Sequence, residues 1–369
     1  MNFCAAAKRL TNPMISLTRL AIFSITSFLI SFLLFPVIIK IFKQLKWVDV
    51  PGPHKIHSDF VPSMGGVAIL VGATLALLMA LPLQQWITMK YFFISVALMF
   101  LIGLRDDVLA LSPRQKLFSQ FLPVFVLVFL DNVTLVSLYG LIPESYFPIP
   151  LLYFASLFTV IIITNAYNLI DGIDGLAGTI GFLILFFYGV WFYVADQPFL
   201  SLIALCFACA LIAFLFFNWQ PSSIFMGDTG ALTVGLIVSY FAIRFINHNY
   251  ELPGDHVAKF HASISTAICV LIIPVFDTLR VIIIRLRSMQ SPFHADRNHL
   301  HHRLLALGLS HADAVKWIVG INIFFLTIAL LLKSQSDFVL LPIIVIACLF
   351  ISFALKWKQQ HPFNPVTND

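Results

Sequence analysis

The chain has little charge and few cysteines for its length. Of its 369 residues, 11% are charged and 60% are apolar, and the mean hydropathy is +0.95, whereas soluble domains carry about 25% charged residues. This composition excludes a soluble globule and a disordered chain. The five cysteines are odd in number and scattered through apolar segments, so they exclude a disulfide scaffold and predict free thiols.

The sequence contains many long runs of apolar residues. A helix that spans a bilayer needs about 20 predominantly apolar residues, and we count about eleven such runs. We therefore predict an all-α, polytopic membrane protein in which residues 1–369 form one domain. The first run follows several basic residues and is interpreted as a retained helix. The predicted spans lie near residues 18–40, 65–82, 91–104, 117–132, 150–168, 176–194, 199–217, 230–246, 263–284, 314–333 and 338–357.

Basic residues are divided unequally between the two sides of the predicted membrane. Fifteen of the 22 Lys and Arg belong to the loops after the first, third and ninth predicted spans or to the carboxyl tail. The positive-inside rule then predicts an amino terminus outside the membrane and a carboxyl terminus in the cytoplasm. Loops that bind anionic substrates would show the same bias, so this asymmetry does not report topology alone.

The acidic residues are nearly all aspartates, and several stand at the ends of predicted spans on the cytoplasmic side. Only two of the 17 acidic residues are Glu. The aspartates are Asp106 and Asp107 (DD), Asp171 and Asp174 (NLIDGIDG) and Asp228 (FMGDTG). One such motif alone is most often a helix cap or a turn. Three on one face predict a bound cation, because like charges about 4 Å apart cost about 4 kcal/mol at an effective dielectric of 20.

The same loops hold cationic and hydrogen-bonding side chains. A site with charges of both signs is typical of a phosphate or diphosphate that is bridged by a metal ion. The spacing of the histidines leaves zinc as an alternative, although no cysteine accompanies them, and a solvated loop cluster is another. The residues concerned are Lys55, Lys116, Arg297, His299, His301 and His302.

Asp277 is an ionisable residue within the apolar segment PVFDTLR. An ionisable group in a predicted span is a functional hypothesis by default. The alternative is an ion pair with Arg280, three residues further along the same helix face. The CxxC formed by Cys206 and Cys209 lies inside an unbroken apolar run, which favours packing over metal binding or redox chemistry.

Five separated blocks of the sequence resemble the polyprenyl-phosphate N-acetylhexosamine-1-phosphate transferases, or glycosyltransferase family 4. The resemblance covers nearly the whole chain. The HxHH form after Arg297 is similar to the undecaprenyl-phosphate N-acetylglucosamine-1-phosphate transferases (WecA type), whereas the muramoyl-pentapeptide enzymes tend to carry three consecutive histidines. The blocks are HKIHSDFVPSMGG (54–66), the DD motif with Lys116 beyond it, NAYNLIDGIDGLAG, FMGDTG and SPFHADRNHLHH.

The resemblance implies that an N-acetylhexosamine 1-phosphate, foremost GlcNAc-1-phosphate, passes from a UDP-sugar to undecaprenyl phosphate, with release of UMP. It implies Mg²⁺, or Mn²⁺ in its place, held by Asp228 and Asp107. The implied catalytic residues are Asp106, Asp107 and Asp228, and the implied substrate-binding residues are Lys55, Lys116, Asn168, Asp171, Asp174, Phe225, Arg297, His299, His301 and His302. The active site is expected in the cytoplasmic loops near 41–64, 105–116, 165–178, 218–229 and 285–313.

The expected partners are the two substrates and the lipids of a bacterial inner membrane, with the active site on the cytoplasmic face. No nucleic-acid partner is expected, and a homodimer stays open. The same chemistry with UDP-N-acetylmuramoyl-pentapeptide or an N-acetylated 6-deoxyhexosamine as donor is the main alternative. A membrane transporter is a distant one, since ionisable groups within membranes often mark ion pathways.

Overall fold

The structure is a computed structural model that describes residues 15–45, 61–137, 139–141, 148–289 and 298–361. These residues form helices and no strand, as the sequence predicts. The helices are α2 (Leu17–Gln44), α3 (Gly65–Ala80), α4 (Leu83–Thr88), α5 (Lys90–Val108), α6 (Pro113–Ser119), α7 (Phe121–Phe125), the π-helix η1 (Val126–Leu130), α8 (Ile149–Leu169), α9 (Leu176–Val194), α10 (Pro198–Asn218), α11 (Gly227–Glu251), α12 (Ser263–Val270), α13 (Ile272–Arg287), α14 (Leu300–Ala306), α15 (His311–Leu331) and α16 (Asp337–Gln360).

Seven helices in the described ranges are long and apolar enough to cross a membrane, namely α2, α8, α9, α10, α11, α15 and α16. The helices α12 and α13 form an eighth candidate that is bent by 86°. The predicted spans near 65–82, 91–104 and 117–132 fall short: α3 has 16 residues, α5 ends in charged residues, and the third divides into α6, α7 and η1. The protein is therefore a multi-pass helical membrane protein, and the count of eleven spans and the orientation of its termini stay predictions.

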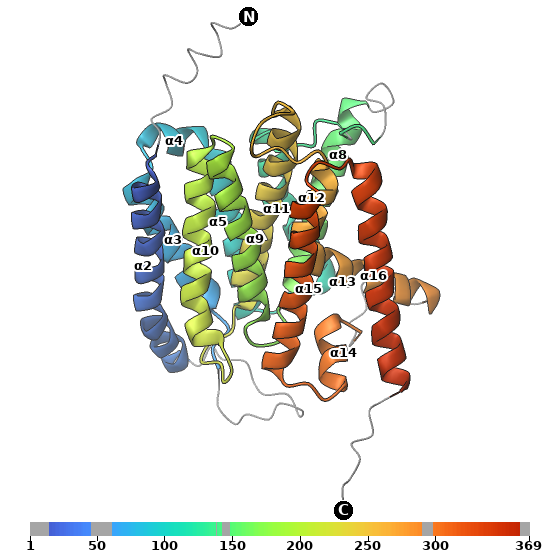
Figure 1. Ribbon diagram of the computed structural model, residues 1–369. Helices are drawn as coiled ribbons and strands as arrows, with labels where there is room; N and C mark the ends of the chain where they lie inside the picture. Colours follow the sequence, from blue (N-terminus) through green and yellow to red (C-terminus); the bar gives the residue numbers. More distant parts are fainter. Residues whose placement is uncertain (1–14, 46–60, 138, 142–147, 290–297, 362–369) are drawn as a thin grey trace, which may run out of the picture.

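The helix α11 is the centre of the bundle. Within its most apolar stretch 94% of the residues are buried, against 11% in α16. It packs against α3, α5, α8, α9 and α12, with α2 and α16 at opposite sides of the molecule in Figure 1. The most apolar stretch of α11 has a mean hydropathy of 1.7, the lowest of the seven candidate spans, against 3.0 in α16. Lipid accommodates the more apolar helices, so the least apolar one is best placed inside the bundle.

Glycines let two helices approach the start of α11 closely. A Cβ atom built on Gly66 of α3 would lie 2.2 Å from the backbone nitrogen of Gly230, and one on Gly103 of α5 would lie 2.5 Å from the carbonyl oxygen of Asp228. No larger residue fits such contacts, because the neighbouring atoms are backbone. The ends of α3 and α5 are therefore fixed against the first turn of α11.

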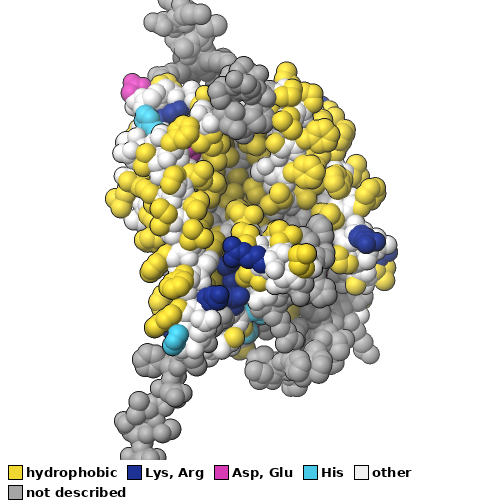
Figure 2. Space-filling model, turned by 90° about the vertical axis from the view of Figure 1, so that its right-hand side faces the viewer, with side chains coloured by type: hydrophobic (Ala, Val, Ile, Leu, Met, Phe, Trp, Pro, Cys, Tyr) yellow, Lys and Arg dark blue, Asp and Glu magenta, His cyan; other side chains and the backbone are white. Residues whose placement is uncertain are grey.

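The bundle has two ends that differ in chemistry (Figure 1). At one end, α5, α8 and α10 finish and α11 begins, and we call it the Asp228 end. At the other end α11 finishes and residues 252–262 follow it, and we call it the Asn249 end. Figure 2 shows one face of the molecule, on which apolar side chains cover most of the surface and Lys and Arg gather mainly in the lower part.

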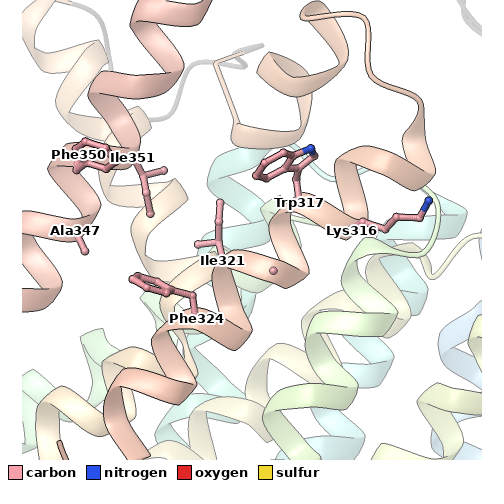
Figure 3. A pocket seen from close by; sticks show the side chains of 8 residues that line it. Lys316, Trp317, Ile321, Phe324, Ala347, Phe350 and Ile351 are labelled. Atoms are coloured by element: carbon pink, nitrogen blue, oxygen red, sulfur yellow. The ribbon is translucent and has the colours of Figure 1, made fainter. Parts of the chain in front are cut away.

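An open groove of about 600 Å³ lies between α15 and α16. It is lined by Trp317, Ile321, Phe324 and Phe350 among others, with Lys316 as the one charged side chain of its lining (Figure 3). The groove contains none of the aspartates that the sequence motifs single out. The four cysteines of the described ranges are free thiols, and Cys206 is buried in α10, as the sequence predicts.

Candidate active site

The carboxylate of Asp107 holds the first turn of α11. Its Oδ1 accepts a hydrogen bond of 2.8 Å from the backbone N–H of Asp228, and its Oδ2 accepts one of 2.8 Å from that of Thr229. The hydroxyl of Thr229 also donates to Oδ2. The first N–H groups of a helix lack partners within the helix, so a carboxylate from α5 that accepts them fixes the position of Asp228.

The ammonium of Lys116 lies between two carboxylates that are far apart in the sequence. Its Nζ is 3.0 Å from Oδ2 of Asp106 and also contacts Oδ1 of Asp228. The other oxygen of Asp106 accepts a hydrogen bond of 2.7 Å from the backbone N–H of Leu111. Lys116 stands on the short helix α6, whose start is fixed by a capping box between Ser112 and Gln115. The structure thus brings together three residues that the sequence predicts for the site.

The segment before α3 runs beside the segment before α11. The backbone N–H of Phe225 donates to the carbonyl of Pro62 over 2.9 Å, and the carbonyls of Phe225 and Met226 accept from Gly65 and Gly66 over 2.9 and 3.0 Å. These backbone contacts place the half-buried ring of Phe225 next to the first turn of α11. The geometry of this pairing depends on backbone atoms, which explains why no single side chain in this block predicts it.

The loop after α8 carries Asp171 and Asp174. The backbone N–H of Gly175 donates to Oδ1 of Asn218 over 2.8 Å, and Nδ2 of Asn218 donates to the carbonyl of Ile224 over 2.9 Å. The amide of Asn218 therefore ties this loop to the segment before α11. Asn218 belongs to none of the sequence motifs, and its only signal in the sequence is a polar residue at the end of an apolar helix.

The other carboxylates of the site affect the pKa of Asp171. Burial raises its pKa, and the negative charges of Asp228, Asp107 and Asp174 add to the effect, so the pKa of Asp171 is about 7 instead of 3.8. A carboxyl group with this pKa is close to half ionised at neutral pH. The aspartates of three separate motifs therefore share one electrostatic environment, as the sequence predicts.

The histidine segment reaches the same loop. A Cβ atom built on Gly172 would lie 2.2 Å from Nε2 of His301, so the imidazole rests directly on the loop backbone. His301 is buried, and burial together with the charge on His302 lowers its pKa to about 3, which leaves the ring neutral at pH 7. Nδ1 of His311 lies 4.0 Å from Oδ2 of Asp174. Sequence analysis did not identify His311, which begins α15 outside the HxHH motif.

The remaining predicted residues have different placements. Asn168 is half-buried in the last turn of α8. The ring of His302 lies 4.2 Å from that of His301. His299 lies beside Asp277, at 2.9 Å, and the predicted ion pair of Asp277 with Arg280 is confirmed, also at 2.9 Å. Lys55 and Arg297 lie outside the described residues.

The donor set fits a hard divalent cation that shares its ligands with a substrate. Within the described ranges, no group of three or more His, Cys, Asp or Glu side chains is close enough to hold a metal ion. Mg²⁺ does not require such a group, because it is usually bound by one or two carboxylates, several waters and substrate phosphates. The half-exposed carboxylate of Asp228, with Asp171 nearby, offers oxygen ligands of this kind. Zinc, which takes four protein ligands in structural sites, fits these residues poorly.

Comparison with known proteins gives one family and a set of named relatives. Residues 89–246 match the model of glycosyl transferase family 4. A Bacillus subtilis protein named "Probable undecaprenyl-phosphate N-acetylglucosaminyl 1-phosphate transferase" is 30% identical over 95% of both chains. A decaprenyl-phosphate N-acetylglucosaminephosphotransferase of Mycolicibacterium smegmatis is 31% identical over 75% of this chain and 74% of its own. A phospho-N-acetylmuramoyl-pentapeptide-transferase of Wolbachia pipientis is 35% identical over 57% of this chain and 70% of its own. The chain therefore belongs to glycosyl transferase family 4, the superfamily of polyprenyl-phosphate N-acetylhexosamine-1-phosphate transferases that its motifs resemble.

Proposed function

We propose that this protein transfers N-acetylglucosamine 1-phosphate from UDP-N-acetylglucosamine to undecaprenyl phosphate. The products are undecaprenyl diphosphate N-acetylglucosamine and UMP. One observation carries the proposal: Lys116 joins Asp106 to Asp228 at the start of α11, with Asp171 in the same electrostatic environment. The carboxylates can bind a divalent cation, and the ammonium can bind a phosphate. Together, at one end of a membrane bundle, they can hold two phosphorylated substrates close to each other.

The reaction exchanges one phosphoanhydride bond for another. An oxygen of the lipid phosphate forms a bond to the β-phosphorus of the UDP-sugar, and the bond from this phosphorus to the bridging oxygen breaks. The electron pair leaves with UMP. The lipid phosphate is already an anion at neutral pH, so positioning contributes more here than a strong general base.

Lys116 is the residue proposed to hold the lipid phosphate. Its ammonium already contacts two carboxylates, and a phosphate that enters the site would compete with Asp106 and Asp228 for it. Such a contact orients the attacking oxygen and lowers the repulsion between the two substrates. Asp106 then serves to position the ammonium.

Mg²⁺ is proposed as the cofactor, with Mn²⁺ as a substitute. Asp228 is the proposed ligand, and Asp107 supports it through the first turn of α11. Oδ1 of Asp107 accepts a single hydrogen bond among the described residues, so a role as second ligand stays a prediction. When bound, the ion would neutralise charge on the diphosphate and on the leaving UMP.

The site is proposed to face the cytoplasm of a bacterial inner membrane. A long isoprenoid tail stays in the bilayer at about 0.8 kcal/mol per buried methylene, which brings its phosphate to the level of the lipid headgroups. The Asp228 end lies where several membrane helices finish, so its carboxylates stand at a comparable depth. The UDP-sugar is water-soluble and arrives from the cytosol.

A panel of donors tests the proposal. Purified protein with undecaprenyl phosphate and Mg²⁺ is expected to release UMP from UDP-N-acetylglucosamine, measured by a coupled nucleotide assay. UDP-N-acetylmuramoyl-pentapeptide and an N-acetylated UDP-6-deoxyhexosamine serve as competing donors. Two relatives with N-acetylglucosamine in their names match three quarters or more of this chain, which supports the first donor. Faster turnover of either competing donor would make that donor the substrate in place of UDP-N-acetylglucosamine. Ion or solute transport without UMP release would overturn the proposal.

A further inference from the structure

Asp277 is a buried carboxylate on α13 that accepts hydrogen bonds from two parts of the chain. Its side chain is 1% exposed. On its own helix, Nη2 of Arg280 donates to Oδ1 over 2.9 Å. Across from it, the backbone N–H of Leu300 donates to Oδ1 over 2.8 Å, and Nδ1 of His299 lies 2.9 Å from Oδ2. An ion pair within α13 needs only the first of these contacts, so the other two require another explanation.

Arg280 extends the same connection. Its Nη2 donates to the backbone carbonyl of Asn298 as well as to Asp277. Asp277 and Arg280 together therefore contact residues 298, 299 and 300 in sequence, at the start of α14. We call these two side chains the α13 clamp. A buried ion pair of this kind contributes more to a defined geometry than to net stability, because desolvation offsets its attraction.

The clamp fixes the segment that places His301 on the Asp171 loop. The rings of His299 and His301 lie parallel, with centroids 5.9 Å apart and 12° between their planes. Nε2 of His301 faces Gly172, the residue next to Asp171. Leu300, whose N–H the clamp holds, directly precedes His301, so a shift of the clamped segment would carry His301 with it.

The carboxylate also determines which nitrogen of His299 carries a proton. An ionised carboxylate only accepts hydrogen bonds, so Nδ1 of His299 must donate to Asp277. The second ring nitrogen, Nε2, is then the atom that His299 presents to any ligand. An asparagine at position 277 could accept from Leu300 but would offer an N–H to His299, which reverses the arrangement.

We propose that Asp277 is a positioning residue for the sugar-diphosphate donor, and that it acts through His299 and the segment 298–301. This inference rests on the proposed function for its kinetic consequence. Asp277 lies at the centre of the clamp and takes no part in bond formation. The proposed function gives the lipid phosphate to Lys116, which leaves the histidine segment and the Asp171 loop, in contact through His301 and Gly172, for the donor. The contribution of Asp277 is the geometry of this segment, and so the affinity for the donor and not for the lipid acceptor.

Steady-state kinetics with both substrates provide the test. Asp277→Asn is expected to raise KM for the UDP-sugar about tenfold, with KM for undecaprenyl phosphate within about twofold. Asp255→Asn is the matched control, since this exposed aspartate follows α11 at the Asn249 end, opposite the site. A merely structural role would lower kcat or protein yield and leave the two KM values in proportion.

A double-mutant cycle separates action through His299 from an independent effect. If Asp277 acts through His299, Asp277→Asn combined with His299→Gln is expected to be no worse than His299→Gln alone, within about twofold. A donor KM in the double variant that rises by the product of the two single increases would overturn the inference. His299→Gln leaves the Asp277–Arg280 pair in place, so its donor KM remains informative where Asp277→Asn does not fold. An unchanged donor KM in His299→Gln would also overturn the inference.

Hydrogen exchange gives a readout that does not depend on activity. The amide of Leu300 is expected to exchange slowly in the wild-type protein and at least about tenfold faster in Asp277→Asn, measured by mass spectrometry of the peptide that spans 298–306. Fast exchange of the Leu300 amide in the wild-type protein would show that the α13 clamp does not hold this segment. Absence of UMP release by the wild type would contradict the proposed function alone, whereas an active wild type with normal Asp277→Asn kinetics would contradict only this inference.

Discussion

The two ends of the bundle differ in the partners of their polar side chains. At the Asn249 end, the amide of Asn249 donates to the carbonyl of Phe260 over 2.7 Å and to Oγ of Ser263 over 2.6 Å, and it accepts from the N–H of Phe260 over 2.8 Å. One carboxylate there, Asp131, faces one guanidinium, that of Arg244, at 3.1 Å. Asn249 and Asp131 thus have neutral or opposite partners within the protein, so neither group needs a ligand.

At the Asp228 end, the ion pairs among the described residues give two carboxylates one ammonium. Asp106 and Asp228 share the ammonium of Lys116, and the negative charges of Asp228, Asp107 and Asp174 raise the pKa of Asp171 beyond the effect of its burial. Like charges at close range raise the free energy of the folded state, and a divalent cation would lower it again. The difference indicates that one end stabilises the bundle while the other is arranged to bind charged ligands.

The largest expected effect comes from Asp228→Asn. Loss of this carboxylate is expected to reduce UMP release by about 10³-fold, because charge stabilisation at the reacting diphosphate is lost. The melting temperature should stay the same or rise, since one negative charge leaves a crowded site. Asp255→Asn, an exposed aspartate that follows α11 at the Asn249 end, is the control and should keep full activity. Full activity of Asp228→Asn would remove this residue from the site.

Cation binding at the Asp228 end is expected to depend on pH. Asp171, with its pKa of about 7, is protonated below neutral pH and contributes its negative charge above it. The affinity for Mg²⁺ is therefore expected to rise by up to about tenfold per pH unit below 7 and to level off above it. Isothermal titration calorimetry between pH 5.5 and 8.5 measures this, and Asp171→Asn should flatten the profile.

The same pKa shift has a consequence for stability in the absence of a cation. The folded pKa of Asp171, about 7, lies above the ordinary value of 3.8. The folded protein therefore keeps a proton that the unfolded chain loses between these values, and the free energy of unfolding falls as the pH rises from about 4 to about 7. A melting temperature that does not depend on pH over this range, in the presence of a chelator, would contradict the shift.

The smallest effect on chemistry is expected at the Asn249 end. Asn249→Ala leaves the buried N–H and carbonyl of Phe260 without their partner, which costs about 1 to 3 kcal/mol of unfolding free energy. Thermal unfolding in detergent should show the loss, while KM for both substrates stays unchanged. A change in KM would mean that the two ends are coupled, and it would break the division between a stabilising end and a binding end.

Part of the site was predictable because local sequence determines it. Aspartates next to the ends of apolar runs must lie near a membrane face, whatever the packing, since a charged group in the hydrocarbon region is costly. This reasoning is enough to select Asp106, Asp171 and Asp228 as candidates for one site. It cannot separate Asp107 from Asp106, because adjacent residues on a helix point in different directions, and the neighbours of that helix decide which direction faces the site.

The sequence by itself determined that the chain forms apolar helices within a membrane and that its aspartates stand at the ends of these helices. Both follow from the one-dimensional pattern of hydropathy, since each residue contributes to it independently of the rest of the fold. Only the tertiary structure decided that Lys116 joins Asp106 to Asp228, that Asp107 holds α11, and that Asp277 anchors the histidine segment over Gly172. These contacts join segments up to about 130 residues apart, and their distances depend on how the helices pack, which no local pattern records.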